Sequence, residues 1–70
     1  MEILSERLRD LRNEKRISLA KLAEQVNVSP SVVFYWEKGG EPTASNLKKL
    51  ALFFDVSADY LIGLENEDGS

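Results

Sequence analysis

Two short helical patterns lie close together between Ser18 and Gly39, and no other feature of the sequence limits the fold as strongly. The first pattern spans about residues 19–26 and the second about residues 30–38. The residues between them have room only for a tight turn. The chain is therefore expected to contain a sharp corner between two helices, a feature of small all-α domains.

Each of these two helices has residues near its ends that can start or stop it. Ser18 and Ser29 are suitable N-cap residues, because a serine hydroxyl can accept a hydrogen bond from an amide of the first turn. Pro30 fits the first helical turn, and Gly39 can end the second helix in the left-handed conformation. This arrangement has the shape of a helix-turn-helix unit, although other small helical bundles also contain tight corners.

Three more helices account for nearly all of the remaining sequence. One is expected at about residues 5–15, one after an N-cap at Thr43, and a short one between an N-cap at Ser57 and Gly63. No strand pattern or internal repeat is present in the sequence. The apolar residues expected to face inward recur at helical spacing: Leu4, Leu8, Leu11, Leu22, Ala23, Val33, Trp36, Leu47, Leu50, Ala51 and Phe54.

The length of 70 residues corresponds to one small domain, expected to span residues 1–64. The last six residues, ENEDGS at 65–70, carry three acidic side chains and are expected to form a flexible acidic tail. The net charge of −3 argues against indiscriminate binding to nucleic acid. Without the tail, nine basic residues balance nine acidic ones, so the acidity is partly a property of the tail.

Histidine and cysteine are both absent, which argues against several classes of site. Without these ligands, we expect no metal site and no cofactor. The acidic residues are scattered, so the sequence offers no catalytic carboxylate pair and we do not expect an enzyme. No apolar run approaches the roughly 20 residues of a membrane span, and the first ten residues do not resemble a signal peptide. The sequence therefore predicts a cytoplasmic protein.

The helix expected at residues 30–38 has two different faces. A turn of 100° per residue places Val33 and Trp36 on one side, where they can join a core. The opposite side carries polar and aromatic side chains, namely Ser31, Phe34, Tyr35 and Lys38. This outward face contains no Arg, Asn or Gln.

Four segments of the sequence match a known family in order and spacing. They are RLRDLRNEKRIS at 7–18, KLAEQVNVS at 21–29, VVFYWEKG at 32–39 and LKKLALFFDVSADYLIG at 47–63. Through them, residues 5–64 resemble the phage lambda/434 repressor and Cro-like helix-turn-helix family, the xenobiotic response element type. The resemblance implies a compact five-helix domain of a prokaryotic or phage transcriptional regulator. Such a domain is expected to bind operator-like double-stranded DNA as a homodimer, with helix 30–38 in the major groove.

The resemblance also implies which residues contact DNA bases. Carried over to this chain, the base-contact candidates are Pro30, Ser31, Phe34 and Tyr35. Guanine is usually read by Arg or Lys and adenine by Asn or Gln, and none of these types occupies these positions. Leu19 stands where the family often has glutamine, and Gly40 and Glu41 stand where its loop often has basic residues.

Phosphate contacts are expected from helix starts and from basic side chains near them, because a helix N-terminus presents free N–H groups. The candidates are Arg16, Ser18, Leu19, Lys21, Ser29 and Lys38. Glu41 would repel a nearby phosphate, so we expect weak and salt-sensitive binding. In the family, an arginine of the first helix pairs with a glutamate of the third. The matching residues are Arg12 and Glu37, which implies an architectural ion pair.

Three interpretations of Phe34 and Tyr35 remain open. The rings can pack on thymine methyl groups of DNA, they can anchor a protein partner, or one of them can fold against the domain. The protein-interaction module is thus the alternative to DNA binding. Two interpretations also remain for a second surface, which can either join two copies on DNA or close the bottom of the core. Its residues are Leu52, Tyr60, Ile62 and Leu64.

Overall fold

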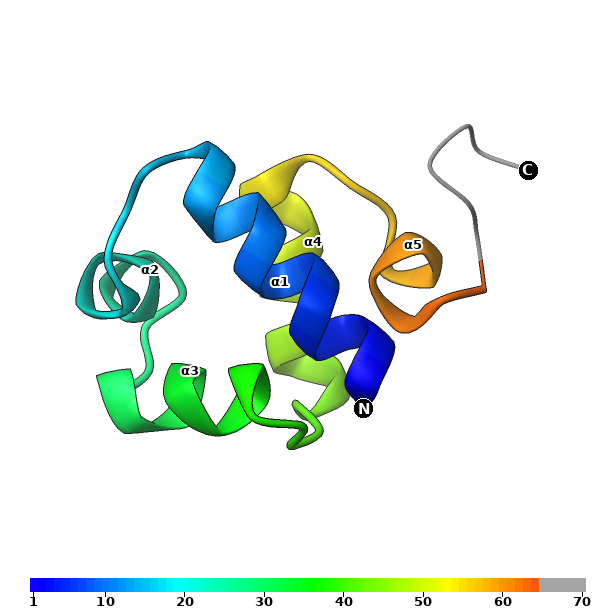
Figure 1. Cartoon of the computed structure of the whole chain (residues 1–70), viewed down its shortest axis with the longest axis horizontal. Helices are drawn as coiled ribbons and strands as arrows, with labels where there is room; N and C mark the ends of the chain where they lie inside the picture. Colours follow the sequence, from blue (N-terminus) through cyan, green and yellow to red (C-terminus); the bar gives the residue numbers. More distant parts are fainter. Residues whose placement is uncertain (65–70) are drawn as a thin grey trace.

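The computed structural model describes residues 1–64, and the acidic tail expected at residues 65–70 lies outside them. The described part contains five helices and no strand, which confirms the expected fold class (Figure 1). Their bounds are α1 at Glu2–Glu14, α2 at Leu19–Gln25, α3 at Pro30–Glu37, α4 at Ala44–Phe54 and α5 at Ala58–Ile62.

Helix α1 crosses the molecule, with α2 and α3 toward one end, α5 at the other, and α4 behind it (Figure 1). It packs against both α3 and α5, while α2 packs against α3 and α4 against α5. The guanidinium of Arg7 ties α1 to α5, because it donates to the Tyr60 carbonyl and lies 4.2 Å from the centroid of the Tyr60 ring. Within residues 1–64, every helix is too short or too polar to cross a membrane.

All five helices contribute to one core. The predicted inward-facing residues are buried in it or packed against it, and Leu11, Leu47 and Ala51 belong to the partly buried group. Trp36 is 2% exposed and is the largest buried side chain. The buried apolar residues of the core are Leu4, Leu8, Leu22, Ala23, Val26, Val33, Trp36, Leu50, Phe54 and Leu61.

The first helix begins earlier than the sequence pattern predicts, at Glu2 instead of about Ser5. Ser5 is buried within α1 and does not start it. Its hydroxyl lies 2.8 Å from the carbonyl oxygen of Met1, four residues back, and 2.5 Å from that of Trp36. A serine inside a helix can bond in this way to the preceding turn, and the same hydroxyl also links α1 to α3.

Three of the four predicted serine and threonine caps are present. The hydroxyls of Ser18, Thr43 and Ser57 each accept a hydrogen bond from the amide three residues later, at 2.9 to 3.2 Å. Ser29 is the N-cap residue of α3 as predicted, but its hydroxyl makes no cap hydrogen bond. The Ser29 hydroxyl lies instead 3.0 Å from the Ser31 hydroxyl, which takes the place of a backbone amide as its hydrogen-bond partner.

Candidate nucleic-acid interface

The corner between α2 and α3 depends on one residue in the left-handed conformation. Asn27 has φ +58°, a value that asparagine adopts more readily than most residues. The amide of Val28 donates to the carbonyl of Ala23 at 2.9 Å, so the end of α2 is closed before α3 begins. Pro30 occupies the first turn of α3, as the sequence predicts. This local geometry directs one side of α3 away from the core.

The outward side of α3 carries every base-contact candidate. Val33 and Trp36 are buried on the inner side, whereas Phe34 is 51% and Tyr35 is 58% exposed. Phe34 is thus only half covered by the domain, and Tyr35 is slightly more open. The remaining base-contact candidates, Pro30 and Ser31, are also exposed, and so is Lys38, a phosphate-contact candidate. We call Ser31, Phe34, Tyr35 and Lys38 the α3 outer face.

The two aromatic rings of this face have different supports. The Lys38 ammonium lies 5.3 Å from the centroid of the Phe34 ring, which places a positive charge over it. The Tyr35 ring lies against the backbone of Gly40, so closely that a Cβ atom at Gly40 would overlap ring atoms. Sequence reasoning missed this contact. Its only signal in the sequence is the pair of glycines at 39 and 40, which indicates the end of a helix and a loop but no contact with Tyr35.

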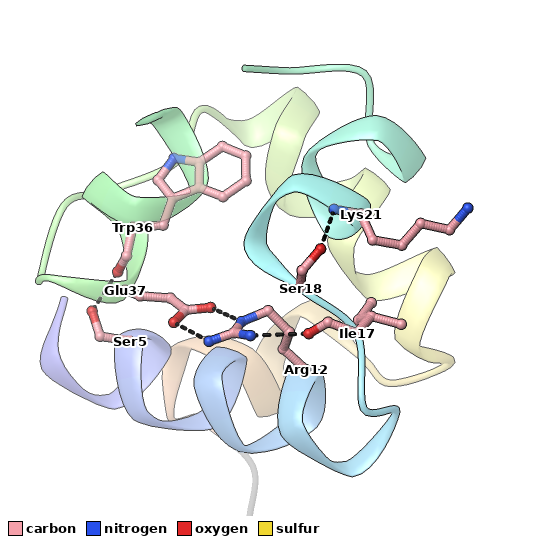
Figure 2. A network of polar contacts seen from close by, with 7 residues as sticks. All are labelled: Ser5, Arg12, Ile17, Ser18, Lys21, Trp36 and Glu37. Carbon is pink, nitrogen blue, oxygen red and sulfur yellow. Dashed lines mark hydrogen bonds and ion pairs between the residues drawn. The ribbon is translucent and has the colours of Figure 1, made fainter. Parts of the chain in front are cut away.

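The phosphate-contact candidates are divided between the α2 start and the residues around it. Ser18 caps α2, and its hydroxyl retains a proton that it can donate. Leu19 is partly buried against the core, so only its backbone is available there. Lys21 extends away from the helix (Figure 2) and has one weak exposed partner, Glu24, at 3.5 Å.

Arg16 and Ser29 complete this set of candidates. Arg16 is exposed in the connection between α1 and α2 and has φ +56°, an uncommon conformation for a residue with a long side chain. Ser29 is exposed at the start of α3, next to Ser31. Together with Lys21 and Lys38, Arg16 provides exposed positive charge on elements next to the α2–α3 corner.

Arg12 and Glu37 face each other behind this surface (Figure 2). Nε of Arg12 lies 2.6 Å from one carboxylate oxygen of Glu37, and Nη2 lies 3.1 Å from the other. Nη1 donates to the carbonyl of Ile17 at 2.9 Å. The Arg12 side chain is 16% exposed and that of Glu37 is 7% exposed. The hydrogen bond with Glu37 raises the pKa of Arg12 above its usual value.

This pair joins three parts of the chain. Arg12 belongs to α1, Ile17 to the connection that leads into α2, and Glu37 to the last turn of α3. A negative charge near the C-terminus of a helix opposes the helix dipole, so Glu37 would destabilise α3 without its arginine. The arrangement therefore holds the C-terminal end of α3 against α1.

The second candidate surface, around α4 and α5, is only partly open. Leu52 is 72% and Leu64 is 75% exposed, whereas Ile62 packs against the core and Tyr60 is covered by Arg7. Tyr60 and Ile62 therefore help to close this end of the core, whereas Leu52 and Leu64 stay exposed, and the contact between two copies remains a prediction.

Comparisons with known proteins agree with this architecture. The chain is 39% identical over 62 residues to the HTH-type transcriptional activator BcrR of Enterococcus faecalis. The matched region covers 87% of this chain and 30% of BcrR. It is 33% identical over 63 residues to the uncharacterized HTH-type transcriptional regulator YobD of Bacillus subtilis (strain 168), covering 89% and 56% respectively. The chain therefore spans about a third and about half of the length of these two relatives.

A solved structure is also similar. The solution structure of the DNA-binding domain of the P22 C2 repressor superposes with a TM-score of 0.80 at 33% sequence identity. The similarity covers 97% of this chain and 87% of that domain. In addition, residues 8–61 match the family described as helix-turn-helix. From the corner at Asn27, the five-helix architecture and these matches, we conclude that the chain belongs to the helix-turn-helix family.

Proposed function

We propose that this chain binds double-stranded DNA sequence-specifically as the DNA-binding part of a cytoplasmic, prokaryotic or phage transcriptional regulator. Its family and fold are those of DNA-binding regulators and not of enzymes. The observation that supports the proposal best is the α3 outer face, which stands free directly after a helix-turn-helix corner. In this arrangement α3 enters the major groove, where base pairs can be distinguished.

Base and phosphate contacts have separate roles in the proposal. Side chains of α3 meet base edges, while the surrounding groups fix the position of the domain on the backbone. The base contacts are assigned to Pro30, Ser31, Phe34 and Tyr35. The phosphate contacts are assigned to Arg16, Ser18, Leu19, Lys21, Ser29 and Lys38.

The charge distribution limits the affinity expected for DNA. The whole chain carries a net charge of −3, and Glu41 is exposed a few residues beyond α3. Repulsion between Glu41 and nearby phosphates lowers the affinity, and the binding that remains depends on phosphate contacts, which salt weakens. We therefore expect binding that is readily detected only at low ionic strength.

A homodimer on DNA is part of the proposal. One recognition helix reads only a few base pairs, whereas two of them about 34 Å apart read two half-sites on one side of the duplex. The exposed side chains of Leu52 and Leu64 provide apolar surface for contact between two copies. Footprinting of a selected duplex tests this point, since a dimer protects two half-sites and a monomer protects one.

The decisive experiment is selection of duplexes from a pool with a randomised core of about 20 base pairs, at low salt. The selected duplex and a scrambled duplex of equal composition are then titrated at about 50 and 200 mM salt. We expect at least a roughly thousandfold preference for the selected duplex, in line with specific DNA-binding proteins. A pool that shows no enrichment, or equal binding of the two duplexes, would contradict the proposal.

A protein-interaction module is a second candidate, because two half-exposed aromatic rings on one face resemble the anchors of protein interfaces. In that case Phe34→Ala and Tyr35→Ala would abolish capture of the partner, and salt would have little effect. The same variants would leave general DNA binding unchanged.

A further inference from the structure

The α3 outer face has an uncommon composition for a surface that contacts base pairs. It presents one hydroxyl, two aromatic rings and one ammonium group, from Ser31, Phe34, Tyr35 and Lys38. Bidentate recognition of adenine needs the amide of Asn or Gln, and the commonest recognition of guanine needs Arg or Lys. Only Lys38, after the last residue of α3, belongs to these types. The rings therefore provide most of the surface available for contact.

Aromatic rings match one chemical feature of the major groove. Thymine is the only standard base that presents a methyl group there, and apolar side chains recognise it by contact. Phe34 and Tyr35 are each about half exposed, so each ring can still cover such a group. The removal of one buried methyl group corresponds to about a fourfold loss of affinity.

Basic side chains on and around this part of the domain favour DNA as the occupant of this face. The Lys38 ammonium lies over the Phe34 ring at 5.3 Å, and Lys21 and Arg16 are exposed on neighbouring elements. The positive charge of Lys38 beside the rings, and those of Lys21 and Arg16 elsewhere on the domain, complement the phosphates that flank a groove. A purely apolar protein partner would gain nothing from them.

Gly40 leaves room for the Tyr35 ring at its observed position. The Gly40 amide donates to the Tyr35 carbonyl at 2.9 Å, and the ring lies against the same residue. The two adjacent glycines differ in what they allow. Gly39 has φ +110° with open space where a Cβ would be, so glycine is needed there for the backbone. At Gly40 no positive φ is required, and a Cβ would meet the Tyr35 ring instead.

We propose that Phe34 and Tyr35 read thymine methyl groups in the major groove, and that Gly40 is a positioning residue that holds the Tyr35 ring for this contact. The inference rests on the proposed DNA-binding function and specifies which chemical group is recognised.

The test uses duplexes that the wild-type 70-residue chain selects from the randomised pool. Each duplex is made twice, once with thymidine and once with deoxyuridine, which lacks only the methyl group. For the wild-type chain, we expect affinity to fall about fourfold for each contacted methyl group, and more than tenfold for two. Tyr35→Ala should reduce the ratio of the affinity for the thymidine duplex to that for the deoxyuridine duplex. Tyr35→Phe, which retains the ring, should preserve this thymidine-to-deoxyuridine ratio.

The positioning role of Gly40 has a readout that folding alone does not change. Gly40→Ala should reduce the thymidine-to-deoxyuridine ratio in the wild-type background. It should have no further effect on that ratio in the Tyr35→Ala background, because the ring that it displaces is absent. Urea unfolding followed by Trp36 fluorescence establishes that each variant is folded.

The outcomes separate the two proposals. If no duplex is enriched, both the DNA-binding function and the methyl recognition are wrong. If a duplex is enriched but its deoxyuridine form binds equally well, only the methyl recognition is wrong. If Phe34→Ala and Tyr35→Ala retain the full wild-type ratio, the methyl groups are read elsewhere or indirectly, and the assignment to these rings fails. If Gly40→Ala also retains the ratio, its positioning role is refuted.

Discussion

Replacing Arg12 by alanine should destabilise the domain by about 3 kcal/mol. The change removes two hydrogen bonds to Glu37 and one to the Ile17 carbonyl, and it leaves a carboxylate that is 7% exposed without its partner. Breaking a buried ion pair from one side costs roughly 3–5 kcal/mol. Arg12 is itself 16% exposed, so water can reach the vacated space, and the lower end of that range applies.

This loss is large compared with the stability of such a chain. A domain of 70 residues is stable by about 4–10 kcal/mol, and a loss of about 3 kcal/mol lowers its melting temperature by roughly 20 °C. Urea unfolding can be followed by the fluorescence of Trp36, which is the only tryptophan and is 2% exposed. Arg9, exposed on the same helix, supplies the matched control, Arg9→Ala.

A double-mutant cycle isolates the interaction between the two residues. Because Glu37→Ala removes the stranded carboxylate, the double variant should be clearly more stable than the sum of the two single losses predicts. The reasoning is refuted if Arg12→Ala shifts the unfolding midpoint no more than Arg9→Ala, or if the two single effects simply add.

Three further predictions concern residues at or near the starts of α2 and α3. Ser18→Ala should lower the free energy of unfolding by about 1 kcal/mol, whereas Ser29→Ala should cost only a few tenths, because only Ser18 caps its helix; equal thermal shifts would contradict this. Lys21→Ala should weaken binding to selected and scrambled duplexes alike and reduce the salt slope by about one unit, and a change confined to the selected duplex would argue against a phosphate contact. Arg16→Gly should unfold at a higher urea concentration than Arg16→Ala, because a residue with a Cβ in the left-handed conformation costs about 1–2 kcal/mol. Both variants should bind DNA more weakly than the wild type, and equal unfolding midpoints would show that the backbone at this position is not strained.

The elements of the fold could be predicted from the sequence because they depend on local signals. Apolar spacing indicates the helices, and a serine or threonine before an apolar run indicates most of their starts. The start of α1 could not be predicted in this way. Ser5 has the residue type of a cap, but the buried carbonyl of Trp36, 31 residues away, accepts its hydrogen bond. The cap hydrogen bond predicted for Ser29 is missing for a related reason, since the hydroxyl of Ser29 lies against that of Ser31 instead.

The candidate site could be predicted in outline but not in its packing. Helical periodicity identifies which side chains of α3 face outward, and the resemblance to repressors suggests that Arg12 and Glu37 pair. The position of the Tyr35 ring depends on the path of the loop after α3, which has no periodic pattern. The sequence therefore does not distinguish Gly40 from other loop residues, although the Tyr35 ring lies against it.

The attachment of α3 through Glu37 has a consequence for how new DNA preferences can arise. The ion pair and the Trp36 contacts hold this helix entirely from its inner side, so the residues that face outward can be exchanged without loosening its attachment. A recognition helix transplanted from a relative should therefore carry its DNA preference into this scaffold if it brings a glutamate at the position of Glu37. Grafted onto a domain that lacks the matching arginine in its first helix, the same segment would bring a buried carboxylate with no counter-charge. Such a graft would lose stability as Arg12→Ala does, whatever its DNA preference.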